Sequence, residues 1–221
     1  SRFCIQSPLS VGLYAGKWCS YAAPPDLPHD QREEDGGSLI YETEPLSEAL
    51  EILGSPVVNL EVSSSRPMAM IAVRLSDVAP DDKATRITYG LLNLCHRNGH
   101  AAPELLEPER MYSVQVPMNY IAQSFPAGHR LRISISSSYW PLAWPSPFPV
   151  RLSIYSGASR LVLPVRRPKE IDKNLKRFQE PEGAPAVAVS QVQPKKHAWR
   201  VIRDLGRDEA TLEVVKDEGA L

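Results

Sequence analysis

The chain has 221 residues, of which 43% are hydrophobic, and a net charge of −1 with acidic and basic residues well mixed. This balance excludes the basic surface that nucleic acid or an anionic membrane requires, so we expect neither as a partner. No apolar run approaches the ~20 residues needed to span a bilayer. The 21 prolines are spread along the chain, which argues against long helices and suits a fold of many short strands.

The first part of the chain, residues 1–37, shows little hydrophobic periodicity. It begins with Ser instead of Met, carries no signal-peptide pattern, and includes the charge-rich stretch from Pro24 to Asp30. We predict an extended approach segment here, leading into a β-domain over residues 38–221. We also expect that the chain is a piece of a longer protein, cut at both ends.

Runs that alternate apolar and polar residues follow throughout the middle of the chain. Each run has one face to bury and one face to leave in water, as in antiparallel sheets. In one run, for example, Arg74 and Ser76 are expected on the wet face, and in another Ser134 and Ser136. The five clear runs lie at 58–63, 71–76, 112–116, 130–136 and 150–154, and weaker ones at 39–41, 87–94, 161–165, 199–202 and 212–215.

About ten short strands, separated by Gly, Pro and Asp turns, predict an all-β antiparallel sandwich or jelly roll. The only helical window, Leu46–Leu53, is too short to stand alone, and a turn followed by a strand is the alternative. Residues 98–109 are predicted to form a loop. Residues 167–196, rich in Lys, Glu, Pro and Ala, are predicted to form a long loop, after which the strands in residues 197–221 return to the sheet.

The cysteines and histidines do not form a convincing metal or disulfide pattern. Cys4, Cys19 and Cys95 contain no C-x-x-C pair, so we interpret them as reduced thiols of a cytoplasmic protein, with a Cys4–Cys19 bridge as the disfavoured alternative. Cys95, His96 and His100 have the identities of metal ligands, but the Asn-Gly pair between the histidines argues against a helical ligand face. We therefore expect no metal and no cofactor.

A hydrolytic triad is not predicted in this chain. The G-x-S-x-G turn that presents a nucleophilic serine is absent, and no strand feeds a long helix on which it could lie. His129 follows Gly128 just before an alternating run, and one histidine without a partner makes no mechanism. We interpret His129, Arg130 and Arg132 as structural residues that bind loop carbonyls or carboxylates, and Asp77 as part of an Asp-rich turn that lacks the ligand spacing of a calcium loop.

The aromatic segment Tyr139-Trp140-Pro141-Leu142-Ala143-Trp144-Pro145 allows two interpretations. Exposed tryptophans on a sandwich can stack against sugar rings, or they can pack against a neighbouring domain, where Trp buries much area with few rotatable bonds. We favour the second interpretation, and propose Tyr139, Trp140 and Trp144 as interdomain contact residues.

A series of short motifs in sensible order covers about residues 25–166 and resembles one known family. The motifs are Asp30-Gln-Arg32, Asp35, SLIYETEPL (38–46), ILGSP (52–56), LEVSSS (60–65), AVRLSDVAPD (72–81), GLLNL (90–94) with His96-Arg97, FPAGHRLR (125–132) and ISSS (135–138). Together they resemble the C-terminal β-domain of the X-prolyl dipeptidyl-peptidase and cocaine-esterase family of serine hydrolases. Asp82 replaces a usual Gly, so that turn is expected to differ in shape. Residues 167–221 match more weakly.

This resemblance implies a jelly-roll, galactose-binding-like sandwich joined in cis to an α/β-hydrolase domain. In the family, that other domain supplies the catalytic Ser, Asp and His, and the β-domain packs on it, can wall the cleft and can contribute homo-oligomer contacts. No catalytic residue is carried over onto this chain, which is therefore expected to be inactive alone. The parent would cleave after an X-Pro unit, or cleave an ester or acyl bond. The alternative is a free-standing carbohydrate-binding or assembly module with the same fold.

Overall fold

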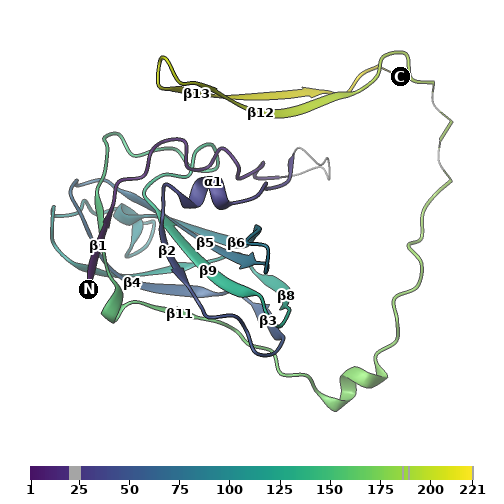
Figure 1. Cartoon of the computed structure of the whole chain (residues 1–221), viewed down its shortest axis with the longest axis horizontal. Coiled ribbons are helices and arrows are strands. Elements are labelled where there is room, and N and C mark those ends of the chain that lie inside the picture. The colour runs from purple at the N-terminus through teal and green to yellow at the C-terminus, as the bar shows by residue number, and fades with distance from the viewer. Residues whose placement is uncertain (20–25, 186, 189, 221) are drawn as a thin grey trace. The chain divides into compact units, whose positions relative to one another are not determined.

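The computed structural model describes residues 1–19, 26–185, 187–188 and 190–220. Two compact units make up the chain, residues 1–166 and residues 167–221 (Figure 1). The residues Pro24 and Pro25 of the predicted extended stretch lie outside the described ranges.

The first unit is an antiparallel β-sandwich, as the alternating runs predict. One sheet pairs β4 with β7 along one edge and with β10 and β11 along the other, and β1 pairs with β10. A second sheet has the order β2-β9-β5-β6, and β3 pairs with β8. The bounds are β1 (Arg2–Ile5), β2 (Leu39–Glu42), β3 (Leu50–Gly54), β4 (Val57–Ser64), β5 (Met70–Val78), β6 (Ala84–Asn93), β7 (Tyr112–Pro117), β8 (Ile121–Phe125), β9 (Arg130–Ser136), β10 (Leu152–Tyr155) and β11 (Arg160–Val162).

Consecutive strands cross between the layers, which is the connectivity of a jelly roll. The chain runs from β4 in the first sheet to β5 and β6 in the second, returns in β7, and crosses again with β9 and β10. Side chains from both sheets meet in one large buried cluster that includes Leu60, Val73 and Ile135. The prediction of an all-β antiparallel sandwich is confirmed.

Short helical turns and loops connect the strands. Within the predicted helical window, residues 50–53 belong to β3, so the alternative of a turn followed by a strand is correct. The predicted loop at 98–109 contains neither helix nor strand. Among the described residues of the first unit, the helical elements include α1 (Arg32–Asp35), η2 (Leu94–His96) and η3 (Ser156–Ala158).

Residues 1–19 and 26–37 are part of the sandwich unit, although we expected an approach segment. β1 pairs with β10 from Arg2↔Tyr155 to Ile5↔Leu152. Further along, Val11 and Ala15 are buried in a second cluster together with Met70, Ala72 and Tyr139. The N-terminal segment therefore contributes buried side chains to the fold.

The polar face of β5 and β9 is covered, which corrects the expectation that it is wet. Arg74, Ser76, Ser134 and Ser136 are all fully buried. Arg74 and Ser134 donate to Asp35 of the N-terminal segment, and Ser136 donates to the carbonyl of Ser138, which follows β9. These two parts of the chain therefore cover this face. An alternating pattern shows which residues share a face, but it does not show whether other parts of the chain cover that face.

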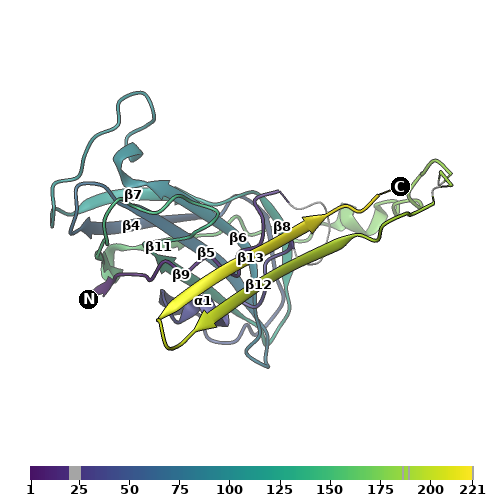
Figure 2. The same cartoon turned by 90° about the horizontal axis from the view of Figure 1, so that it is seen from above.

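The second unit contains a short 3-10 helix, η4 (Glu170–Asn174), and a β-hairpin. Its strands β12 (Lys196–Asp204) and β13 (Glu209–Asp217) pair with each other from Lys196↔Asp217 to Asp204↔Glu209 (Figure 1, Figure 2). We expected these strands to return to the sandwich sheet; among the described residues they instead form a sheet of their own.

Across the described residues of both units, none of the helices has the length and apolarity that crossing a membrane requires.

Candidate functional site

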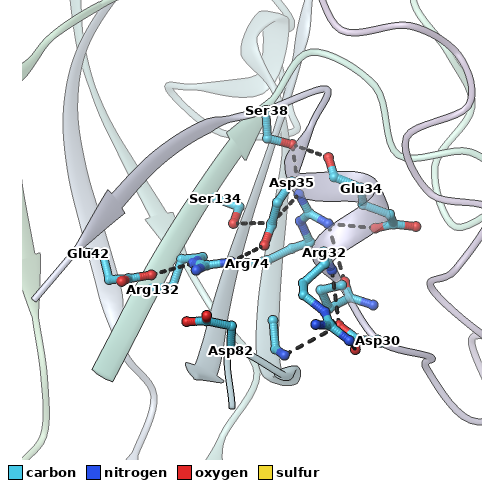
Figure 3. A network of polar contacts seen from close by, with 12 residues as sticks. Asp30, Arg32, Glu34, Asp35, Ser38, Glu42, Arg74, Asp82, Arg132 and Ser134 are labelled. Atoms are coloured by element: carbon cyan, nitrogen blue, oxygen red, sulfur yellow. Dashed lines mark hydrogen bonds and ion pairs between the residues drawn. The ribbon is translucent and has the colours of Figure 1, made fainter. Parts of the chain in front are cut away.

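A network of buried charges lies between α1 and the β2-β9-β5-β6 sheet, centred on Arg74 of β5 (Figure 3). The Arg74 guanidinium donates to Glu34 Oε2 at 2.6 Å and to Ser38 Oγ at 2.7 Å. It also reaches Gln31 Oε1 at 3.2 Å and Asp35 Oδ1 at 3.4 Å. Because the side chains of Arg74 and Glu34 are both inaccessible to water, this ion pair is hardly screened by solvent.

The Glu34 carboxylate joins the N-terminal segment to this network. Its Oε1 accepts hydrogen bonds from the backbone N–H groups of Gly12, at 3.0 Å, and Tyr14, at 2.7 Å. Burial raises the pKa of Glu34 above its ordinary value, while Arg74 and the two N–H groups act in the opposite direction. One carboxylate therefore holds the turn at residues 12–14 and the sheet at the same time.

A second arginine extends the network toward the surface. Arg132 of β9 donates to Asp35 Oδ2 at 2.7 Å and to Glu42 Oε2 at 2.5 Å, and Ser134 Oγ donates to Asp35 Oδ1 at 2.7 Å (Figure 3). Arg130 binds the other oxygen of Glu42, at 2.7 Å, and also pairs with Asp82. A continuous series of ion pairs thus connects the buried Arg74 with Asp82, which lies in the exposed turn after β5.

The four residues interpreted as structural lie in or beside this network. Arg130 and Arg132 share Glu42, and His129 Nδ1 lies 2.8 Å from Asp77 Oδ1. Their carboxylate partners fit the interpretation that these basic side chains bind carboxylates. Asp77 lies within β5 and not in the Asp-rich turn itself.

The sequence interpretation missed the centre of the network, namely Gln31, Glu34 and Arg74. One signal was visible: Arg74 follows four apolar residues and precedes another in the run MIAVRL, so it lies in the middle of a strand whose neighbouring residues are apolar. A fully buried arginine is found in proteins almost only with a partner charge. That rule points to acidic residues elsewhere in the chain, but it does not say which.

The structure brings together two of the three metal-ligand candidates, His96 and His100, but not the Cys95 thiol. His96 Nδ1 and His100 Nδ1 lie 3.2 Å apart, while the Cys95 thiol is buried against the carbonyl of Pro67. Among the described residues, no three His, Cys, Asp or Glu side chains gather closely enough to hold a metal ion. Cys4, Cys19 and Cys95 are all free thiols.

The aromatic segment divides into a buried and an exposed part. Tyr139 is fully buried, its hydroxyl accepts a hydrogen bond from Arg86, and the Arg74 guanidinium lies 5.5 Å from its ring centroid. Tyr139 is therefore a core residue of this unit, and its proposed role in an interdomain surface is wrong. Trp140 is partly exposed and Trp144 is 81% exposed.

Trp144 lines an apolar groove, and Trp140 packs against Trp144. Their rings meet edge to face, with centroids 5.2 Å apart and an interplanar angle of 83°. The adjoining groove has a volume of about 330 Å³ and is lined by Met68, Ala69, Met70, Leu91, Leu92, Asn93, Ala143, Trp144, Pro145, Ser146 and Pro147. This is an apolar concavity with an exposed Trp beside it, a combination typical of protein–protein contacts.

Comparison with known proteins identifies the family. A model described as the X-Pro dipeptidyl-peptidase C-terminal non-catalytic domain matches residues 5–201. The chain belongs to this family. The match includes most of the N-terminal segment, in agreement with the part that this segment has in the sandwich.

Three relatives place the domain among larger proteins. A cocaine esterase of Rhodococcus sp. is 33% identical over 116 residues, which cover 52% of this chain and 20% of the relative. A putative serine esterase of Mycobacterium bovis is 30% identical over 165 residues, covering 63% of this chain and 26% of the relative. An α-amino acid ester hydrolase of known structure shares the fold, with a TM-score of 0.65 and 24% identity over 75% of this chain and 32% of that one. The chain thus spans about a fifth to a third of the length of these proteins.

The buried ion pair leads to a stability prediction. Arg74→Met leaves the Glu34 carboxylate buried without its paired guanidinium and leaves Asp35 with Arg132 alone. We expect it to lower the free energy of unfolding by about 3–5 kcal/mol in urea denaturation. Arg151→Met is the matched control, because Arg151 pairs with Glu109 on the surface and should lose less than about 1 kcal/mol. Equal losses in the two variants would contradict the assignment.

Tyr139 leads to a prediction about alkaline pH. Burial raises the pKa of Tyr139 to about 12 from 10.0, with Arg86 opposing the shift. The folded protein therefore keeps the phenol neutral where the unfolded chain ionises it, so its contribution is intact below pH 10 and is lost as the pH rises toward 12. At about 1.36 kcal/mol per pKa unit, the loss is about 3 kcal/mol.

Urea denaturation of the 221-residue chain between pH 9 and 12 measures this effect as the difference between the unsubstituted chain and its Tyr139→Phe variant. The unsubstituted chain should lose stability relative to the variant across that range. Tyr120→Phe, which removes a highly exposed hydroxyl, is the matched control and should behave like the unsubstituted chain. Parallel pH curves for the unsubstituted chain and Tyr139→Phe would show that Tyr139 is not the buried group.

Proposed function

We propose that this chain is the accessory β-sandwich of a serine hydrolase whose α/β-hydrolase domain, in the same polypeptide, carries the whole catalytic triad. The family match, to a C-terminal non-catalytic domain, supports the proposal, as do the names of the relatives as esterases. The parent would hydrolyse an ester or acyl bond, or a peptide bond after an X-Pro unit. The chain alone would catalyse none of these reactions.

The hydrogen bonds of His129 agree with a non-catalytic role. In a triad, the histidine contacts a serine hydroxyl through one ring nitrogen and a carboxylate through the other. Within the described ranges, His129 binds the Asp77 carboxylate, and no serine hydroxyl contacts its ring. The pair instead joins the beginning of β9 to the end of β5.

The observation that carries the proposal is the exposed apolar surface around Trp144, for which we propose the hydrolase domain as the partner. Trp144 is 81% exposed, and Met68 and Phe148 are 42% and 59% exposed in the same part of the fold. The four prolines at 141, 145, 147 and 149 restrict the backbone here, so that little conformational entropy is lost when the surface docks. Trp140 and Trp144 are the contact residues of this proposal, and the surface would help to shape the cleft or an oligomer.

Sugar stacking by these tryptophans is disfavoured. A flat sugar-binding platform made of two rings needs their faces side by side, whereas the Trp140 and Trp144 rings stand nearly perpendicular to each other. The edge of one ring therefore meets a face of the other, and the pair forms no shared flat surface. A cytoplasmic location is part of the proposal, and it rests on the exposed free thiols of Cys4 and Cys19.

The docking surface yields a prediction for the complete parent protein. Trp144→Ala should lower the thermal midpoint of the parent by several degrees, because a large side chain is lost from a buried contact. The same substitution in the 221-residue chain should leave its midpoint within about 1 °C, because there Trp144 makes little buried contact. Differential scanning calorimetry of both proteins measures the contrast.

Leu53→Ala serves as the control, since Leu53 is also exposed but lies on β3, outside the groove. It should have the same small effect in the parent and in the chain. If Trp144→Ala changed the parent no more than Leu53→Ala does, the proposed docking surface would be wrong.

A further inference from the structure

The strand β11 leaves one backbone edge of the first sheet open. It pairs with β4 from Arg160↔Asn59 to Val162↔Val57, and among the described residues no strand pairs with its other side. An open strand edge presents backbone N–H and C=O groups to which a further strand can add. The question is which polypeptide could reach this edge.

The hydrogen-bond directions along β4 show which residue of β11 faces the open edge. The Glu61 N–H donates to Ser159 Oγ at 3.2 Å, so the Glu61 backbone faces the β10 and β11 side of β4. Because these directions alternate along a strand, Asn59 faces the same side and forms a hydrogen-bonded pair with Arg160. The N–H and C=O groups of Leu161, the next residue, therefore point away from β4 toward the open edge.

The first strand of the chain is directed along this edge. β1 pairs antiparallel with β10, and the Ser156 N–H extends this ladder by donating to the Ser1 carbonyl at 3.0 Å (Figure 1). β10 leads through the turn η3 into β11, and both strands pair antiparallel with β4. Polypeptide that continues β1 before Ser1 therefore runs alongside η3 and then alongside β11.

The register identifies the residue that meets Leu161. From Ile154 to Leu161 the chain takes seven steps, whereas β4 takes four between the residues that face them, from 62 to 58, because η3 forms a bulge. A straight continuation of β1 keeps step with β4, so the residue opposite Leu161 lies four steps before Phe3, which faces Ile154. That residue is the second before Ser1. Its backbone points to the same side as that of Ser1, two steps later, and so faces Leu161.

A half-open apolar pocket lies beneath the same edge. It has a volume of about 160 Å³ and is lined mainly by aliphatic side chains of both sheets, among them Leu60 and Leu161. An engineered cavity of about 150 Å³ holds benzene, so this pocket has room for one apolar side chain. The Phe3 side chain faces the interior of the sandwich, where its ring meets that of Tyr41 edge to face. Because side chains alternate along a strand, the second residue before Ser1 also points its side chain inward, toward the pocket.

We propose that the polypeptide preceding Ser1 in the parent continues β1, pairs with Leu161 of β11 and inserts one apolar side chain into this pocket. The inference rests on the proposed function, in which a catalytic domain precedes this domain in the same polypeptide. The family is that of a C-terminal domain, and the chain spans about a fifth to a third of its relatives, which supports the presence of such a segment. The added strand fixes the point at which the catalytic domain joins the sandwich.

A segment in the same polypeptide is favoured over a free partner as the occupant. The β1 ladder already holds Ser1 beside η3, so the residues before it have a high effective concentration at the β11 edge. The added strand also covers an edge that could otherwise pair with another chain.

Amide hydrogen exchange of Leu161 tests the proposal in three proteins. They are the 221-residue chain, the same chain extended by the roughly ten residues that precede Ser1, which is enough for one strand, and the complete parent. Leu161 should exchange freely in the first protein and at least about 100-fold more slowly in the other two, because its N–H gains a strand partner. The amides of Arg160 and Val162, which face β4, are the internal control and should be protected in all three.

Two aspartate substitutions in the extended chain test the register. An Asp at the second residue before Ser1 places a carboxylate in an aliphatic pocket, and should return the exchange of Leu161 to its rate in the 221-residue chain. An Asp at the first residue before Ser1, whose side chain faces the outer side of the sheet, is the matched control and should retain the slow exchange. Equal rates in the two variants, or a charged natural residue at the second position, would overturn the proposal.

Three exchange results would also overturn it. Leu161 could exchange freely in all three proteins, or slowly in the parent alone, which would make the catalytic domain the partner instead of the strand. Slow exchange that depends on the concentration of the 221-residue chain would make a second copy the partner. Ester and X-Pro peptide hydrolysis by the parent is assayed separately, so that a parent without these activities would contradict the proposed function and leave the Leu161 result standing.

Discussion

The buried guanidinium of Arg74 is the constraint on which the rest of the sandwich depends. A charge in the middle of an apolar strand is tolerated only when partner charges and hydrogen-bond acceptors surround it. Glu34 and Asp35 meet this need, and both come from the segment before the first strand of that sheet. The segment must therefore lie on the β5 and β9 face, and the turn at Gly12 is held there by the same Glu34 carboxylate.

That arrangement also determines what remains exposed. With the N-terminal segment in place, Tyr139 is enclosed between Arg74, Arg86 and the second hydrophobic cluster, whereas Trp144 stays on the surface. The carbonyl of Trp140 lies so close to Gly12 that a Cβ atom there would stand 2.0 Å from it, so only glycine fits at this crossing. The Arg74–Glu34 ion pair thus holds the turn at Gly12, and the backbone of Trp140 packs against that turn. In the proposed hydrolase, the same ion pair would help to fix the position of the groove beside Trp144.

Local sequence pattern predicts the strands well because a sandwich core selects one face of each strand. Runs such as 130–136 coincide with β9, and the sandwich class follows from them. The pattern fails where distant segments meet, because it predicts that Arg74 and Ser134 are exposed to solvent. It also cannot show which of Tyr139 and Trp144 is buried, since the two aromatic residues are similar in chemistry and five residues apart. Of the charge network, the basic residues His129, Arg130 and Arg132 are visible in one motif. Their partners Asp77 and Glu42 are 52 and 88 residues away from His129 and Arg130, respectively, and only the fold brings them together.

Native-state hydrogen exchange tests most directly whether the N-terminal segment is part of the cooperative fold. The amides of Gly12 and Tyr14 donate to Glu34, so each can exchange only when the segment leaves the sheet. Our account predicts that these two amides exchange with the same free energy of opening as amides in the centre of β5, close to that of global unfolding. Exchange of Gly12 and Tyr14 at a free energy near zero, while β5 remains protected, would show that the segment is a loosely attached linker and would contradict the account.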